Sequence, residues 1–146
     1  MNKRLLSSST KLFSAEAATS TLPLVSAIVR DLAPLWQSVQ AAQGRIEKLM
    51  ENRRGSSGDP YAEELSAMQE TMRRKSEQVE EYIDELRQVG VEFKPEKQHC
   101  HVCFPAMVDG KLAYLSWQPG EPEVAHWMEL DGDFDERRPL LEAVIS

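Results

Sequence analysis

The sequence predicts an α+β domain in which a long antiparallel helical hairpin, coiled-coil-like and kinked, packs with a small antiparallel β-sheet. Three observations predict this fold: two apolar stripes with helical periodicity, a turn-rich break between them, and a change to short extended runs after Gly90. A chain of 146 residues is the size of one domain. We therefore expect a flexible basic tail over residues 1–12 and a single α+β domain over residues 13–146.

Two runs of apolar residues at alternating spacings of three and four predict the long helices. One stripe covers residues 25–49 and the other covers residues 61–89. Glycine, serine and proline between them, in residues 51–60, favour a reversal of the chain. Pro34 lies inside the first stripe and should kink that helix. A helical hairpin over about residues 13–90 follows.

Residues at the predicted helix ends have the types that such ends prefer. Ser14 can cap a short first helix, and Asp59 followed by Pro60 can begin the second long helix. Gly90 stands where a glycine commonly ends a helix. These residues support the helix positions independently of the periodicity.

The region of about residues 91–130 has the short runs and turn residues of antiparallel strands. Asp109-Gly110 and Gln118-Pro119-Gly120 are typical hairpin turns. The candidate strands are residues 91–94, 99–104, 112–117 and 124–129. Leu12-Phe13 is a candidate edge strand, and the tail of about residues 131–146 ends in apolar residues that predict a short closing helix.

Charge and composition exclude several classes of protein. The chain has 17 Lys and Arg against 24 Asp and Glu, a net charge of −7, and most of the acidic excess follows residue 61. This balance argues against a nucleic-acid partner, which needs clustered basic residues. No apolar run is long enough for a membrane span, and two cysteines cannot build a disulfide framework. We expect a soluble, cytoplasmic protein without a membrane partner.

Several short blocks of the sequence have a characteristic order and spacing. The blocks are Leu12–Ala17, Leu22–Val25, Gly90–Lys94, Phe104-Pro105-Ala106, Asp109-Gly110, Tyr114-Leu115, Trp117, Gly120-Glu121-Pro122, Trp127, Phe134, Arg137 and Pro139. In these blocks the chain resembles a bacterial family, the domain of unknown function 2203, most specifically in the predicted strands and the segment after them. The resemblance implies the fold, and it implies no established activity.

This chain departs from the family pattern at four positions of its polar cluster. Cys103 stands where the family usually has Asp, and Ser116 where it has Cys. Gln118 replaces Arg, and Met128 replaces His. An enzymatic role carried by that cluster is therefore weakened here, while Glu121, Asp131 and Arg137 remain.

Residues 99–103 form the densest run of side chains suited to metal or redox chemistry. Cys100 and Cys103 have a C-x-x-C spacing, but residues three apart on a regular strand point to opposite faces. His99, His101 and Cys103 share one face and form a candidate site for zinc or a similar transition metal. The alternative is an ordinary strand with buried cysteines and partly exposed histidines.

The sequence supports two function hypotheses. The first is a non-catalytic interaction or assembly module, because the sequence carries two regular heptad stripes and no recognised catalytic motif. A homodimer would cover the apolar sides of the hairpin, with Lys75, Met68 and Met72 near the contact, and a protein partner is the alternative. The second is a metal-binding or small-ligand-binding protein. Its ligand-binding candidates are Glu121, His126 and Arg137.

Lys75 interrupts an otherwise apolar stripe. A lysine at such a position can fix the register of two helices or pair with a carboxylate across their contact. Alternatively, its aliphatic stem packs while its ammonium group reaches solvent.

Overall fold

The computed structural model describes residues 11–52, 62–96 and 99–142. The chain divides into two compact units. Met1–Arg30 and Ile83–Ser146 form the first, which we call the sheet unit, and Asp31–Tyr82 forms the second, which we call the hairpin unit.

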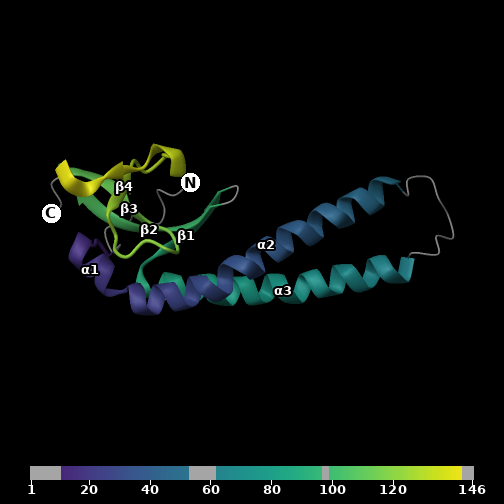
Figure 1. The fold of residues 1–146 in the computed structure, drawn as a ribbon. Helices are drawn as coiled ribbons and strands as arrows, with labels where there is room; N and C mark the ends of the chain where they lie inside the picture. Colours follow the sequence, from purple (N-terminus) through teal and green to yellow (C-terminus); the bar gives the residue numbers. More distant parts are fainter. Residues whose placement is uncertain (1–10, 53–61, 97–98, 143–146) are drawn as a thin grey trace. The chain divides into compact units, whose positions relative to one another are not determined.

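The described residues form long helices and a five-stranded antiparallel sheet, which confirms the α+β class (Figure 1). The strand order follows the sequence. The elements are α1 (Ala15–Ser20), α2 (Leu22–Asn52), α3 (Ala62–Val89), β1 (Glu92–Glu96), β2 (His99–Val108), β3 (Lys111–Trp117), β4 (His126–Met128), η2 (Phe134–Glu136), β5 (Arg138–Pro139) and η3 (Leu140–Glu142).

The sheet has one strand more than the four that the sequence predicts. The additional strand, β5 (Arg138–Pro139), lies within the predicted tail and pairs with β4. The described part of the tail forms two short 3-10 helices, η2 and η3, and the expected closing helix stays a prediction because residues 143–146 lie outside the described residues. The tail up to residue 142 is therefore part of the sheet unit's structure.

The helix ends follow the expected chemistry where the structure describes them. The Ser14 hydroxyl oxygen accepts a hydrogen bond from the backbone N–H of Ala17 at 3.0 Å. Gly90 has φ of 98°, and Val91 donates its N–H to the Leu86 carbonyl at 3.0 Å, which is the glycine-ended helix that the sequence predicts. The expected start of α3 at Asp59-Pro60 lies outside the described residues.

Two other expectations concern the ends and the middle of the helical region. α2 continues through Pro34 without interruption, and the kink at this residue stays a prediction. Residues 11–14 form no strand, although Phe13 donates its backbone N–H to the Pro105 carbonyl at 2.8 Å. The expected edge strand at Leu12-Phe13 is thus replaced by a backbone contact with β2.

The turns between strands confirm the hairpin prediction. Asp109 and Gly110 have φ of 50° and 81°, as in the tight turn that matches the twist of two antiparallel strands. Gly120 has φ of 102°, and Glu121 donates its N–H to the Gln118 carbonyl at 3.1 Å. These turns bring β2, β3 and β4 into antiparallel register.

The two faces of the sheet differ in chemistry. Phe104 is fully buried on one face, where Phe13 packs edge-on against it with ring centroids 5.2 Å apart. Because side chains alternate along β2, His101 and Cys103 lie on the other face. This second face carries the polar residues described below.

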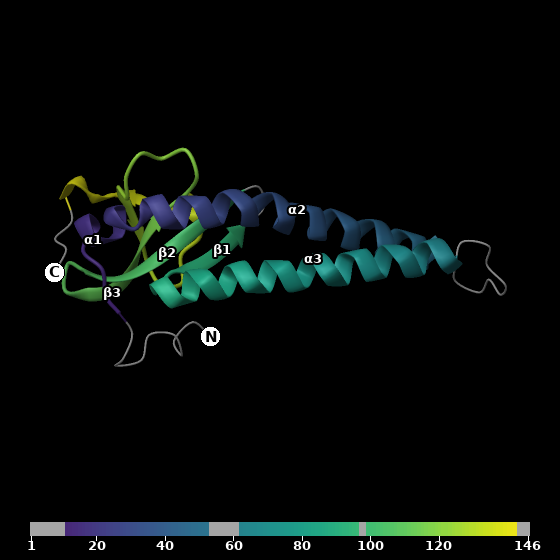
Figure 2. The same ribbon diagram turned by 90° about the horizontal axis from the view of Figure 1, so that it is seen from below.

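In the hairpin unit, α2 and α3 run side by side in both views (Figures 1 and 2). The Lys75 ammonium group donates a hydrogen bond to the Ser38 hydroxyl at 2.8 Å, so this lysine joins the two helices. The buried apolar residues of this unit are Leu32, Val39, Ala42, Ile46 and Val79.

The structure also bears on membrane insertion. None of the helices within the described ranges combines the length and the apolar character that crossing a bilayer requires.

Candidate functional site

Strand register brings residues of four strands to one face of the sheet. Glu96 lies opposite His99, and Lys94 lies opposite His101, across β1 and β2. Ser116 of β3 lies opposite Cys103 on one side and opposite His126 on the other. Residues directly opposite each other in an antiparallel pair share a face and are in contact range. We call this surface the polar face.

The Glu96 carboxylate is the most connected group on the polar face. One oxygen accepts the backbone N–H of Phe134 at 2.9 Å, and the other lies 3.2 Å from Nε2 of His101. The Lys94 ammonium nitrogen lies 3.7 Å from the same oxygen that faces His101. Burial alone would raise the pKa of Glu96, but these three partners together hold it below its usual value. The carboxylate is therefore ionised and fixed in place at neutral pH.

His101 links Glu96 to β3. Its side chain is fully buried, and Nδ1 lies 2.8 Å from the Ser116 hydroxyl. Burial lowers the pKa of His101, and the Glu96 carboxylate offsets only part of that effect. Carboxylate, imidazole and hydroxyl are thus connected, but the carboxylate lies at Nε2 and the hydroxyl at Nδ1, which is the reverse of the hydrolase triad. Ser116 is also fully buried, so its hydroxyl has no access to a substrate.

The Phe134 ring is held between two cationic or aromatic partners. His99 stacks on it with centroids 3.9 Å apart and planes 12° apart, and the Arg137 guanidinium carbon lies 4.5 Å from the ring centroid. His101 contacts it edge-on at 5.1 Å. Two of the predicted metal ligands, His99 and His101, therefore pack on an aromatic ring.

The three predicted ligand-binding residues are brought together beside this ring. Arg137 donates from Nη2 to the Glu121 carboxylate at 2.7 Å and to the Ser116 carbonyl at 3.1 Å. Nδ1 of His126 lies 3.6 Å from the same carboxylate, beyond hydrogen-bond distance. Although burial raises the pKa of Glu121, Arg137 and the backbone N–H of Gln118 bring it below its usual value.

Two buried nitrogens of this group lack a hydrogen-bond partner. They are Nε of Arg137, whose side chain is 8% exposed, and Nδ1 of His126. Native proteins leave few buried polar atoms unpaired, so each of these two nitrogens calls for an explanation, such as an ordered water or a ligand. The cluster is therefore incompletely satisfied by the described residues alone.

The predicted metal ligands and the second cysteine have different surroundings. Cys103 is fully buried against Tyr114, Met128 and Leu130, and burial raises the pKa of its thiol. Cys100 is a separate buried free cysteine. Within residues 11–52, 62–96 and 99–142, no three His, Cys, Asp or Glu side chains are grouped to hold a metal ion. The zinc site stays a prediction from the sequence.

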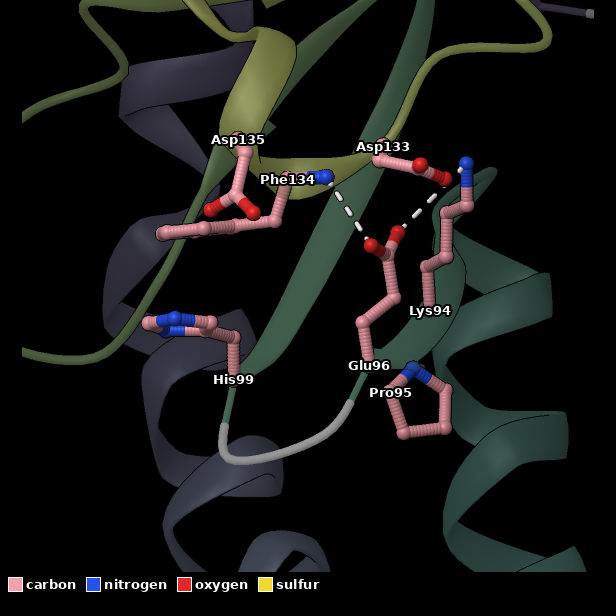
Figure 3. Close-up of a pocket in the computed structure, with 7 residues that line it drawn as sticks. All are labelled: Lys94, Pro95, Glu96, His99, Asp133, Phe134 and Asp135. Carbon is pink, nitrogen blue, oxygen red and sulfur yellow. Dashed lines mark hydrogen bonds and ion pairs between the residues drawn. The ribbon is translucent and has the colours of Figure 1, made fainter.

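A pocket of about 400 Å³ opens at the edge of the polar face (Figure 3). Its walls come from β1, from the start of β2 and from η2 with the residue before it. Figure 3 shows the stacked rings of His99 and Phe134 on one side of this pocket and the Glu96 carboxylate on another. The lining residues are Lys94, Pro95, Glu96, His99, Asp133, Phe134 and Asp135.

Sequence reasoning did not single out Lys94 or Glu96 as site residues, whereas Phe134 and Asp135 lie in the acidic segment of about residues 129–136, whose charge favours a cationic ligand or a basic partner. The alternation of charged residues at 92, 94 and 96 was an available signal, because alternate strand residues share a face. The contact between β1 and η2, 38 residues apart, had no local signal.

Comparison with known proteins bears on the family. Neither the curated proteins nor the solved structures contain a match to this chain. The sequence model of a family of uncharacterised conserved proteins, DUF2203, matches residues 11–140, which include the sheet, the polar face and both long helices. The chain therefore belongs to the DUF2203 family.

Proposed function

We propose that the protein is a non-catalytic small-molecule binding protein, and that its pocket takes a compact organic cation such as an alkyl amine or guanidine. The observation that carries this proposal is the pocket of about 400 Å³, which has three carboxylates and one ammonium group in its lining. Its volume lies within the range of small-molecule sites.

The charge of the lining favours a cation. Glu96 is held ionised by its partners, and Asp133 and Asp135 are exposed acids on the neighbouring segment. Lys94 is partly committed, because its ammonium donates to the Gly132 carbonyl at 2.6 Å. A concave surface of one sign raises the local concentration of ions of the opposite sign.

The pocket is also preorganised. Phe134 is fixed by its backbone hydrogen bond to Glu96 and by the rings and guanidinium around its side chain. A wall that is fixed before binding loses little freedom when the ligand enters. The same burial that fixes His101 and Ser116 removes them from contact with a ligand, which supports binding over catalysis.

Calorimetric titration with agmatine tests this proposal, because agmatine carries both an amine and a guanidinium. We expect a dissociation constant of about 0.1 to 1 mM for a ligand of this size. Succinate, of similar length and opposite charge, should show no binding. Absence of agmatine binding, or equal binding of succinate, contradicts the proposal.

A pair of variants locates the site. Asp135→Asn removes one pocket charge without removing a hydrogen bond described for the fold, and it should weaken agmatine binding about fivefold. Glu123→Gln removes an exposed charge outside the pocket and should change binding by less than about twofold. Equal effects of the two changes would indicate attraction by net charge alone.

A further inference from the structure

The three carboxylates of the ligand pocket differ in how far the protein itself matches their charge. One oxygen of Glu96 accepts the backbone N–H of Phe134 at 2.9 Å. The other oxygen lies 3.2 Å from Nε2 of His101 and 3.7 Å from the ammonium nitrogen of Lys94, the basic residue of the lining. The charge of Glu96 is therefore largely matched within the protein, and so is the charge of Lys94.

The other two carboxylates are not matched in this way. Asp133 and Asp135 are exposed, and neither forms an ion pair with a residue that the structure describes. Figure 3 shows Asp135 on the side of the Phe134 and His99 rings and Asp133 on the side of Lys94. The lining has three carboxylates against one ammonium group, so its formal charge is −2 with His99 counted as neutral.

We infer that the ligand of this pocket is a linear dication, a diamine or an aminoguanidine, with one charged end beside Asp133 and the other beside Asp135. This ligand class rests on the proposed function, because it concerns the same pocket. A ligand with one positive charge would leave one of the two exposed acids unmatched, whereas a dication gains an attraction at each end.

The surface between the two acids suits the hydrocarbon chain of such a ligand. Phe134 separates Asp133 from Asp135 in the sequence, and its ring is held in place by His99, which stacks on it with centroids 3.9 Å apart. Pro95 adds a further apolar side chain to the lining. Small-molecule sites commonly combine apolar walls of this kind with a few charged groups that fix the orientation of the ligand.

A single metal ion fits the same two acids less well. Calcium and magnesium ions collect six or more oxygen ligands around one point. Asp133 and Asp135 lie on either side of Phe134, so their carboxylates diverge (Figure 3). Over the described ranges 11–52, 62–96 and 99–142, the acids are not gathered with other His, Cys, Asp or Glu side chains into a group of three around one ion. Two separated carboxylates favour two separated positive charges.

Calorimetric titration with putrescine and with pentylamine tests the inference. The two ligands have chains of equal length, and a methyl group of pentylamine replaces the second ammonium group of the diamine. We expect putrescine to bind at least about tenfold more tightly at low ionic strength. Equal affinities would overturn the dication and leave the proposed cation pocket intact. If putrescine, pentylamine and agmatine all fail to bind, the proposed function is wrong, and the dication is wrong with it.

Two variants locate the charged ends. Asp133→Asn and Asp135→Asn should each weaken putrescine binding about fivefold. Each should weaken pentylamine binding by less than about twofold, because a monocation can settle beside the remaining acid. Asparagine also suits the position of Asp133 before η2, so the local fold is kept.

Glu123→Gln is the matched control, because it removes an exposed charge outside the pocket lining. It should weaken putrescine binding by less than about twofold. An effect of Glu123→Gln as large as that of Asp133→Asn or Asp135→Asn would overturn the inference. Equal weakening of putrescine and pentylamine by the two pocket variants would overturn it as well.

Discussion

In the sheet unit, the charged side chains of the polar face are largely buried and joined to one another, whereas the ion pairs described for the hairpin unit lie exposed along the helix surface. Arg137 is 8% exposed and contacts Glu121, while Arg73 is 55% exposed and pairs with neighbours on its own helix. Exposed ion pairs contribute little to stability, whereas a buried charge that loses its partner is costly. The sheet unit is therefore the part of the chain where single polar residues determine structure and chemistry.

The same difference appears in the apolar residues. The sheet unit has fully buried aromatic side chains such as Phe104 and Tyr114. The hairpin unit buries small and medium side chains along one seam. A site with a fixed shape is thus expected in the sheet unit.

The largest expected difference between the units concerns their cores. Phe104→Ala should lower the free energy of unfolding of the sheet unit by about 3 to 5 kcal/mol, because it leaves a large cavity in a closed core. Ile46→Ala should cost about 2 kcal/mol, since a single seam can relax around the lost methyl groups. Urea unfolding followed by circular dichroism measures both. Equal losses of unfolding free energy in the two variants would contradict the expected difference in packing between the units.

A smaller effect is expected from the buried guanidinium. Arg137→Met should cost about 2 to 3 kcal/mol, because it leaves the Glu121 carboxylate without its charged partner and the Phe134 ring without its cation. The matched change Arg138→Met removes only an exposed contact with Trp127 and should cost about 0.5 to 1 kcal/mol. Similar costs for the two arginines would show that burial does not distinguish them.

The smallest expected difference between the two units concerns how their stability depends on pH. Glu96 and Glu121 have lowered pKa values, so their contribution to stability is present above pH 4.5 and is lost as the pH falls through their folded values. The pKa of His101 is also lowered in the folded chain. As the pH falls below about 6.5, the unfolded chain takes up a proton on this residue that the folded chain does not, so stability begins to fall there.

Hydrogen exchange between pH 7.5 and pH 4 measures this effect in each unit. Amides of β2 and β3 should lose protection as the pH falls, and amides of α2 in the hairpin unit should lose less. In a His101→Gln variant, the loss between pH 7.5 and pH 5.5 should be reduced. A uniform loss in both units would indicate that net charge, and not the polar face, controls the response.

The sequence predicts local features better than contacts between distant segments. Alternating polarity places His99, His101 and Cys103 on one strand face, and the turn residues at 109–110 define the β2–β3 hairpin. The position of Glu96 against His101 depends on the register of a strand pair whose turn has no strong signal. Phe134 reaches Glu96 through a segment that reads only as an acidic turn.

The same reasoning explains the outcome for the candidate site. Glu121, His126 and Arg137 were expected as ligand residues, and the structure brings them together through β4 and β5. Cys103 packs into an apolar cluster while His99 and His101 pack on Phe134, and the zinc site at these residues stays a prediction from the sequence.

The central claim is that the pocket beside Phe134 binds an organic cation, and nuclear magnetic resonance titration of the full chain with agmatine tests it most directly. The claim predicts saturable shifts of the backbone amides of Phe134, Asp135 and His99, with Asp135→Asn weakening the response about fivefold. Glu123→Gln should leave the response unchanged. The absence of saturable shifts, or shifts spread evenly over the acidic residues of α3, would contradict it.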